Sequence, residues 1–161
     1  MIWSGAAMAE DYRIEAEDVL NVKVFDEPEL SVEEVRVSST GSIAMPLLGE
    51  VSVSGLTTRQ VSEKTRGLLL DGYLKNPRVS VSIYEYRQVF VNGAVKKPGG
   101  YSYQEGLTVQ KAIVLAGGLN ERASTSKITL IRESAPHVAV PVTMNTPVRP
   151  GDIISVGESF F

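Results

Sequence analysis

One stretch, residues 89–119, constrains the fold of this chain more than any other. It opens with Val-x-Val, the period-two pattern of a half-buried strand. Pro98-Gly99-Gly100 then predicts a type II turn, because proline fixes φ and glycine tolerates a positive φ. Thr108 stands where a helix N-cap belongs, and Gly117-Gly118 ends that helix. The stretch therefore predicts a strand, a tight turn, a second strand and a capped helix.

The first half of the chain carries another helix of the same design. Thr57 is its N-cap, Gln60 closes a capping box with Thr57, and Asp71-Gly72 stops the helix. Strands are expected where apolar residues alternate with polar ones or run between turn residues. They cover residues 19–25, 35–37, 43–48 with an extension over 51–53, 79–84, 89–91, 101–103, 128–132, 137–142 and 153–156.

This order of elements predicts an α+β fold with two small domains, each a bent mixed or antiparallel sheet that packs on one helix. The boundary is expected at residues 85–88, which gives domains over 10–86 and 87–161. Residues 1–9 end in a small-x-small sequence, Ala-Met-Ala, the form of a signal-peptidase site. They are interpreted as the tail of an export signal or as residues of vector origin.

Two short sequence echoes link the halves. Gly-Leu-Thr precedes both predicted helices, at residues 55–57 and 106–108. Asp-Val-Leu-Asn-Val at 18–22 resembles Asp-Ile-Ile-Ser-Val at 152–156. These sequence similarities are too short to define a repeat, but they favour two units with similar folds.

Composition and charge exclude several classes of protein. With 161 residues and 43% hydrophobic content the chain can form a packed core, and its net charge of −3 argues against binding to nucleic-acid phosphates. The absence of cysteine excludes disulfides, thiolate metal sites and a cysteine nucleophile. Residues 10–85 hold 8 basic and 14 acidic side chains, and residues 86–161 hold 8 basic and 5 acidic ones. Such opposed charges would help copies of the chain to meet head to tail.

A search for catalytic residues finds little. His137 is the only histidine, and no HExxH, GxSxG or Walker A sequence is present. A glycan-processing enzyme would need two carboxylates that face each other across a cleft. The sequence does not assign Asp26, Glu27 or Glu29 to such a cleft. The sequence predicts no enzyme, and no catalytic residue, cofactor or metal ligand.

Aromatic residues are the candidates for contacts with other molecules. Tyr84 and Tyr86 are two positions apart next to Arg87, and Tyr101 and Tyr103 are spaced for one strand face. Exposed rings of this kind stack on sugars or anchor a subunit interface. The alternative is that these five residues cover sheet edges as ordinary packing.

Taken together, the motifs resemble the outer-membrane polysaccharide export (OPX) family. The first half is similar to its polysaccharide-export domain and the second to a soluble-ligand-binding β-grasp (SLBB) domain. The segments that carry the first resemblance are Tyr12-Arg13-Ile14, Asp18-Val19-Leu20, Gly41-Ser42-Ile43, residues 46–49, 53–57 and 73–79. The second rests on residues 91–95, Pro98-Gly99, Ala116-Gly117-Gly118, Leu130-Ile131-Arg132 and residues 150–154.

The resemblance implies a non-enzymatic periplasmic subunit of a capsular or exopolysaccharide export conduit, associated with the outer membrane. It implies as partners further copies of the chain in a ring, an inner-membrane co-polymerase, the polysaccharide itself and an outer-membrane partner. The alternative from another class of function is a monomeric periplasmic β-grasp module that binds a small saccharide-like ligand.

The chain departs from the family pattern at three points. Glu17 stands where the family has glycine before the aspartate, so a different turn is expected there. No cysteine is available for a lipid anchor, and the sequence stops at Phe161, ahead of the amphipathic helix with which longer members form a pore. This chain alone therefore offers no segment predicted to cross a bilayer.

Overall fold

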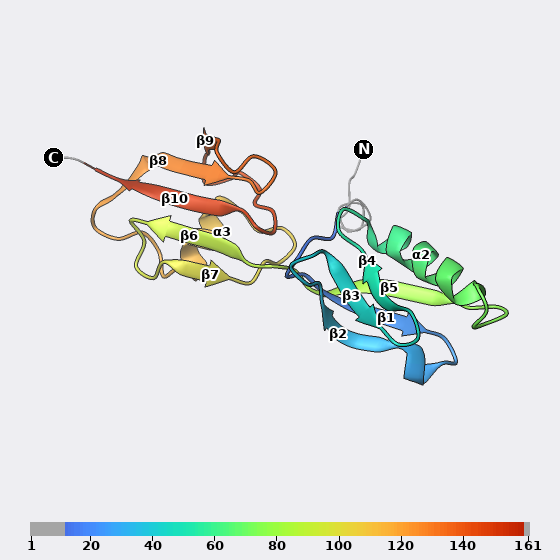
Figure 1. Ribbon diagram of the computed structural model, residues 1–161. Coiled ribbons are helices and arrows are strands. Elements are labelled where there is room, and N and C mark those ends of the chain that lie inside the picture. The colour runs from blue at the N-terminus through green and yellow to red at the C-terminus, as the bar shows by residue number, and fades with distance from the viewer. Residues whose placement is uncertain (1–11, 160–161) are drawn as a thin grey trace, which may run out of the picture. The chain divides into compact units, whose positions relative to one another are not determined.

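The computed structural model describes residues 12–159, which form two compact units divided between Tyr86 and Arg87 (Figure 1). Residues 1–9, singled out from the sequence, lie outside the described residues. Within the described part each unit contains β-strands and one α-helix, so the predicted α+β fold class is confirmed.

The first unit is built on a three-stranded antiparallel sheet with β1 between β2 and β5. The register places Val22 opposite Val32 on one side and Val81 on the other, so their side chains share one face. The unit differs from the expectation of one sheet, because β3 and β4 pair in a separate hairpin. Its elements are β1 (Val19–Val24), η1 (Pro28–Leu30), β2 (Val32–Arg36), β3 (Ser42–Met45), β4 (Gly49–Ser52), α2 (Thr58–Leu70) and β5 (Val79–Glu85).

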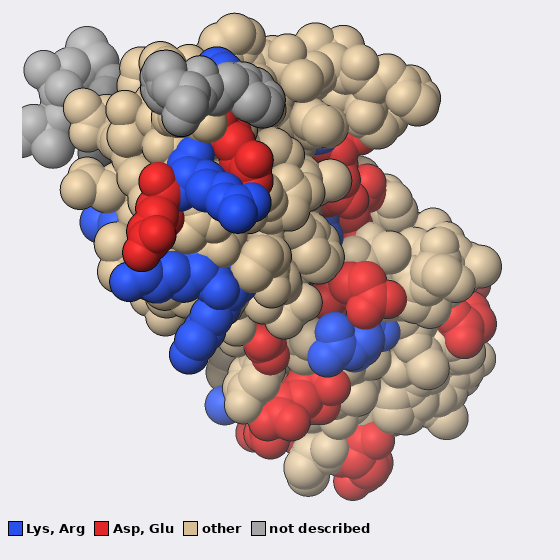
Figure 2. Space-filling view, turned by 90° about the vertical axis from the view of Figure 1, so that its left-hand side faces the viewer, with Lys and Arg blue, Asp and Glu red and all other residues tan. Residues whose placement is uncertain are grey.

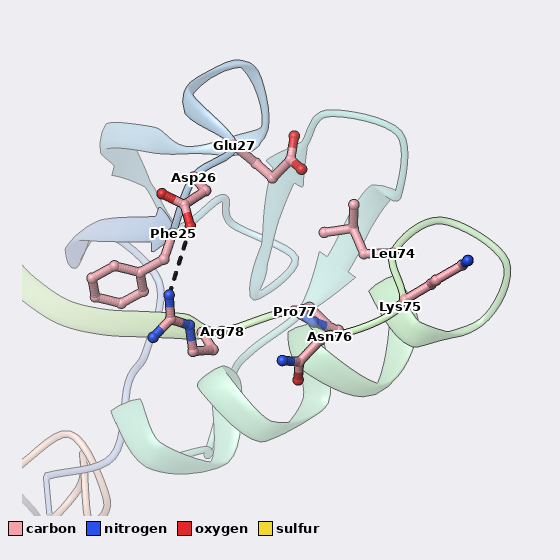
Figure 3. A pocket seen from close by; sticks show the side chains of 8 residues that line it. All are labelled: Phe25, Asp26, Glu27, Leu74, Lys75, Asn76, Pro77 and Arg78. Atoms are coloured by element: carbon pink, nitrogen blue, oxygen red, sulfur yellow. Dashed lines mark ion pairs between the residues drawn. The ribbon is translucent and has the colours of Figure 1, made fainter.

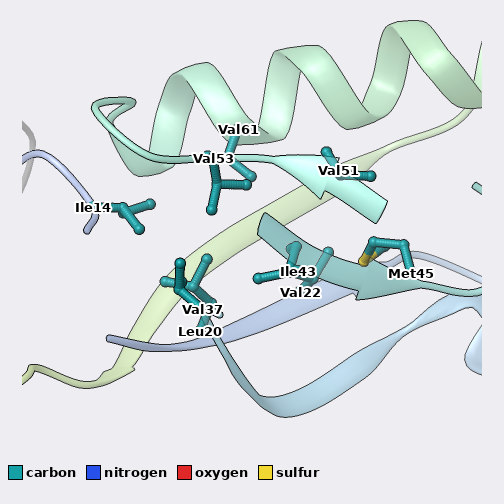
Figure 4. Close-up of a cluster of buried hydrophobic side chains, with 9 residues drawn as sticks. All are labelled: Ile14, Leu20, Val22, Val37, Ile43, Met45, Val51, Val53 and Val61. Carbon is teal, nitrogen blue, oxygen red and sulfur yellow. The ribbon is translucent and has the colours of Figure 1, made fainter. Parts of the chain in front are cut away.

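The core of the first unit lies between the sheet, the hairpin and the helix, as Figure 4 shows. Leu20 and Val22 of β1, Ile43 and Val51 of the hairpin and Val61 of α2 are each at most 2% exposed. Burying such a side chain contributes about 1.5–3 kcal/mol. Because side chains alternate along a strand, this burial turns the intervening residues of β1 and β5 to the opposite face of the sheet.

The second unit contains a five-stranded mixed sheet in the order β7-β6-β10-β8-β9. β10 lies in its middle, parallel to β6 and antiparallel to β8, and Ile154 of β10 faces Val91 and Leu130. A mixed sheet with one helix fits the predicted β-grasp-like domain. Its elements are β6 (Val89–Gly93), β7 (Gly99–Tyr101), α3 (Val109–Leu115), β8 (Ala123–Ile131), β9 (Ala139–Pro141) and β10 (Ile153–Glu158).

Both predicted helix starts are confirmed. The Thr57 hydroxyl accepts a hydrogen bond from the Gln60 N–H (3.2 Å), and the Gln60 side chain accepts one from the Thr57 N–H (2.9 Å). The Thr108 hydroxyl accepts from the Lys111 N–H (3.3 Å). α3 ends before Gly117, whose φ of 84° suits a C-cap.

The strand predicted over residues 43–48 is too long. β3 ends at Met45, and Pro46-Leu47-Leu48 forms the turn of the β3–β4 hairpin. Proline lacks the N–H that a central ladder position needs, and Leu47 adopts a φ of 67° there. Gly49 consequently begins β4 instead of ending the strand.

The type II turn predicted at Pro98-Gly99-Gly100 is also wrong. Gly99 and Gly100 belong to β7, which pairs with β6. The chain leaves β6 at Gly93, where φ is 86° and an added Cβ would lie 2.1 Å from the Val156 carbonyl oxygen of β10. Only glycine fits this close approach, so packing against β10 sets the start of the reversal.

Candidate functional site

Two buried aspartates are the strongest candidates for chemistry, and each is held by hydrogen bonds. Asp18 is fully buried and accepts from the Tyr12 hydroxyl (2.6 Å) and the Glu15 N–H (3.0 Å). Carboxylates that accept such bonds at the start of a strand serve to fix a turn.

Asp152 in the second unit is 2% exposed and accepts from the Arg132 guanidinium (2.9 Å) and the Arg149 N–H (2.7 Å). Burial raises the pKa of Asp152 above its ordinary value, while the Arg149 N–H and then the positive charge of Arg132 act to lower it. The carboxylate lies against donors from its own unit, as expected for a structural group.

The predicted pair Tyr84 and Tyr86 has two different surroundings. Tyr84 on β5 is exposed, and a hydrogen bond with Glu34 raises the pKa of its hydroxyl. Tyr86 packs edge-to-face on Tyr12, with ring centroids 4.9 Å apart and an interplanar angle of 84°. Tyr84 therefore presents a ring to solvent, whereas the Tyr86 ring is engaged within its own unit.

Arg87, Tyr101 and Tyr103 lie in the second unit. The Arg87 side chain is 12% exposed and pairs with the Glu133 carboxylate at 2.6 Å. The Tyr101 hydroxyl donates to the Lys97 carbonyl, and Tyr103 is buried, which raises the pKa of its hydroxyl. The structure thus leaves Tyr84 as the most open of the five predicted contact residues.

A hollow of about 340 Å³ lies in the first unit, between the loop that follows β1 and the loop that leads into β5 (Figure 3). Its lining is mixed, with charged, amide, aromatic and aliphatic groups, and Arg78 pairs with Asp26 at 3.6 Å. Such a lining can offer hydrogen-bond donors and acceptors at once. The residues that line it are Phe25, Asp26, Glu27, Leu74, Lys75, Asn76, Pro77 and Arg78.

Phe25 joins this hollow to the sheet. Its backbone N–H donates to the Arg78 carbonyl (2.9 Å), and its ring is 41% exposed. The Lys23 ammonium lies 4.9 Å and the Arg78 guanidinium 5.6 Å from the ring centroid, within cation–π range.

Sequence reasoning missed this hollow because two loops far apart in the chain form it. One signal was available: Phe25 follows Asn21 and Lys23 at every second position, so an aromatic residue extends the polar face of β1. Of the acidic residues considered for a cleft, Asp26 and Glu27 line the hollow.

The described residues offer no other grouping that suggests chemistry. Within residues 12–159 no cluster of three or more histidine, aspartate or glutamate side chains is arranged to hold a metal ion. In the same range no helix has the length and apolar character to cross a membrane. On the face drawn in Figure 2, basic side chains gather on the left of the view beside a few acidic ones, and acidic side chains predominate at the lower right.

Comparison with known proteins gives two domain matches in tandem. Residues 6–84 match the model described as polysaccharide biosynthesis/export protein, and residues 88–144 match the SLBB domain. The exopolysaccharide production protein ExoF of Rhizobium meliloti (strain 1021) is 34% identical over 154 residues, which cover 84% of this chain and 37% of that protein.

The EPS I polysaccharide export outer membrane protein EpsA gives a similar result in two organisms. The protein of Ralstonia nicotianae is 31% identical over 94% of this chain and 46% of its own length. That of Ralstonia solanacearum is 29% identical, again over 94% of this chain, and 47% of its own length is covered. The chain spans less than half the length of each of these relatives.

Proposed function

Because the chain belongs to the outer-membrane polysaccharide export family, we propose that it is a non-enzymatic subunit of a conduit that exports capsular polysaccharide or exopolysaccharide. It acts in the periplasm in association with the outer membrane. It moves the finished polymer without making or breaking its glycosidic bonds.

The observation that carries this proposal is the tandem order of the two matched domains. An export-type domain over residues 6–84 is followed at residue 88 by an SLBB domain, and both lie within one chain that aligns with named export proteins. The non-enzymatic role is supported by the two buried aspartates, since hydrogen bonds to their own units occupy both carboxylates. The domain limits 10–86 and 87–161 are part of the proposal.

The partners follow from the conduit. Identical subunits form a ring, which works with an inner-membrane co-polymerase and with an outer-membrane partner. Ring closure needs two unlike surfaces on each subunit that meet head to tail. The excess of acidic residues in 10–85 and of basic residues in 86–161 supplies opposite charge to the two halves, which favours that mode of association.

The proposal is tested by deleting the gene from its host and measuring surface polysaccharide in the deletion strain and after complementation. We expect the deletion strain to lose surface polymer while polymer is retained inside the cells. Surface polymer is expected to return when the intact gene is restored. Export that continues unchanged in the deletion strain would overturn the proposal.

A second measurement separates the conduit from a monomeric ligand-binding module. Light scattering of the purified chain with its co-polymerase is expected to show a high-order assembly. Saccharide titration is expected to show weak binding that strengthens with oligosaccharide length. A chain that stays monomeric and binds a small saccharide with submicromolar affinity would favour the module instead.

A further inference from the structure

The sheet of the first unit has one face that the core does not use. The buried face carries Val22 and Val81, so their neighbours on β1 and β5 point the other way. The register pairs Asn21 with Ser82 and Lys23 with Ser80, which places these four polar side chains side by side. Three of the four are exposed and Asn21 is half-buried. We call this surface the polar face.

Each end of the polar face carries an exposed aromatic ring. Tyr84 continues the line of Ser80 and Ser82 along β5 and is 56% exposed. At the other end Phe25 continues the line of β1, pairs through its backbone with Arg78 and opens onto the hollow of Figure 3. Tyr84 follows Arg78 by six positions, so at about 3.3 Å per residue the rings lie on the order of 20 Å apart along the strand direction.

We propose that the polar face, together with the hollow at its Phe25 end, is a contact surface for an extended saccharide chain. This inference rests on the proposed export function and adds to it the residues that touch the polymer. The Tyr84 ring stacks on a sugar, the serine hydroxyls and the Asn21 amide exchange hydrogen bonds with sugar hydroxyls, and Lys23 and Arg78 donate to oxygens at the far end.

The composition of the surface favours a saccharide over a protein partner. Protein interfaces are depleted in serine and lysine at their centre and need a fully buried apolar core. Between Phe25 and Tyr84 the polar face offers hydroxyl, amide and ammonium groups instead. Such groups match the dense hydroxyls of a sugar chain, and one aromatic ring supplies the stacking surface.

The electrostatic pattern along the face adds a direction. Tyr84 has Glu34, Glu33 and Glu85 close enough for their charges to act on its hydroxyl. The opposite end carries the cations Lys23, Lys75 and Arg78 and the acidic side chains Asp26 and Glu27, so that positive charge exceeds negative charge by one even with Arg78 paired to Asp26. A saccharide with carboxylate substituents is therefore drawn to the Phe25 end, whereas a neutral sugar suits the Tyr84 end.

The test is an NMR titration of the full chain, labelled with ¹⁵N, with two probes at millimolar concentration. One probe is a neutral glucan hexasaccharide, and the other is an acidic hexasaccharide of alternating glucuronic acid and N-acetylglucosamine. We expect shifts of the amide signals of residues 20–25 and 78–84, with the acidic probe shifting the Phe25 end more strongly. Residues 87–161 are expected to stay unchanged.

Three variants sharpen the test. Tyr84→Ala is expected to weaken binding about fivefold to tenfold through loss of the stacking ring, and Tyr84→Phe, which keeps the ring, to change it by less than about twofold. Phe90→Ala removes another exposed aromatic residue (45% exposed, against 56% for Tyr84) from a strand of the second unit and is the matched control, with no expected change.

Unchanged amide signals at residues 20–25 and 78–84 with both probes, or equal weakening of saccharide binding by Tyr84→Ala and Phe90→Ala, would overturn this inference. The export function would then still stand if deletion of the gene abolished surface polymer. Conversely, the purified chain could bind saccharide at the polar face while deletion of its gene leaves export intact. That result would support the contact surface and contradict the export function.

Discussion

The two units begin one strand each with the same turn. In the first, the Asp18 N–H donates to the Glu15 carbonyl (3.2 Å), and the Asp18 carboxylate accepts from the Glu15 N–H. In the second, Asp152 and Arg149 make the same two contacts, with 3.1 Å for the backbone bond. The sequence similarity between residues 18–22 and 152–156 therefore reflects the same turn, which forms once in each unit.

The surroundings of that turn also correspond. The Ile14 N–H donates to the Leu56 carbonyl (2.8 Å), and the Val148 N–H donates to the Leu107 carbonyl (2.9 Å). Both acceptors stand in the Gly-Leu-Thr segments that precede α2 and α3. The same link thus joins the strand turn to the helix start in both units.

The two turns differ in the second partner of the carboxylate and in the residue before it. Asp18 meets a neutral phenol, whereas Asp152 meets a guanidinium. Glu17 adopts a φ of 79° where Gly151 has 87°. The comparison teaches that the backbone of this turn is fixed, while its side-chain partner and even its glycine are exchangeable.

The largest expected effect is a difference in the stability lost when each of the two buried carboxylates is removed. Asp152→Ala should lower the free energy of unfolding of the second unit by about 3 kcal/mol, because it leaves the Arg132 charge without its buried partner. Asp18→Ala should cost the first unit about 2 kcal/mol, since the Tyr12 hydroxyl and the Glu15 N–H, two neutral donors, lose their acceptor. Denaturant unfolding followed through the amide signals of each unit measures both values.

The exposed pair Arg59–Glu63 supplies the control for these variants. Glu63→Ala should change the stability of the first unit by less than about 0.5 kcal/mol. If Asp18→Ala lowered the free energy of unfolding as much as Asp152→Ala or more, the Arg132 guanidinium would add nothing to the stability of the second turn.

The next effect concerns the residue before each aspartate. Gly151→Ala should destabilise the second unit by about 2 kcal/mol, because alanine resists a positive φ and its Cβ would displace Glu133 from Arg87. Glu17→Gly should stabilise the first unit by up to about 1 kcal/mol through relief of backbone strain. Thermal unfolding of both variants measures the contrast.

Glu17→Ala is the matched control, since it removes the exposed ion pair with Arg36 but keeps the positive φ. Its stability should stay within about 0.5 kcal/mol of the parent. If Glu17→Gly were no more stable than Glu17→Ala, the two turns would not be strained in the way their φ angles indicate.

A smaller effect is expected at Thr65, a third buried polar residue. Unlike the aspartates, it is buried in α2 with no hydrogen-bond partner for its hydroxyl among the described residues. Thr65→Val should raise the free energy of unfolding of the first unit by about 1 kcal/mol, because it removes an unsatisfied hydroxyl. Thr65→Ser keeps the hydroxyl and loses a methyl group, so a stabilised Thr65→Ser would contradict this reason.

The smallest effect is a pH dependence of the stability of the second unit. Burial raises the pKa of Asp152 above the ordinary 3.8, so the folded state binds this proton more tightly than the unfolded state does. The extra stability that comes from this tighter proton binding is therefore fully present below pH 3.8 and is lost as the pH rises through the raised pKa, while the contacts with Arg132 and Arg149 remain. A carboxyl-carbon NMR titration in which Asp152 titrates below 3.8 would show instead that Arg132 outweighs burial.

The sequence predicts the helices of this fold well and its reversals poorly. The helix caps can be predicted directly from Thr57, Gln60 and Thr108, because a cap depends on residues within one turn of helix. The reversals after β3 and β6 depend on tertiary packing. Leu47 adopts a conformation that its side chain disfavours, and Gly93 is selected by the nearby strand β10.

The candidate site was predictable only in part. Period-two alternation identifies Tyr84 as outward-facing, as the structure places it. The same alternation does not reveal that Tyr86 meets the ring of Tyr12, which lies far earlier in the chain, or that Arg87 meets Glu133. The hollow beside Phe25 likewise requires two loops that only the folded sheet brings together.

The position of the central strand gives the two units opposite orders of assembly. During synthesis β1, the centre of the first sheet, emerges before both strands that flank it. β10, the centre of the second sheet, emerges after all four of its companions. The first unit can grow outward from its middle, whereas β6 and β8 have an open gap between them until residues 153–158 arrive. The second unit consequently has the longer window in which unpaired strand edges are exposed to other chains.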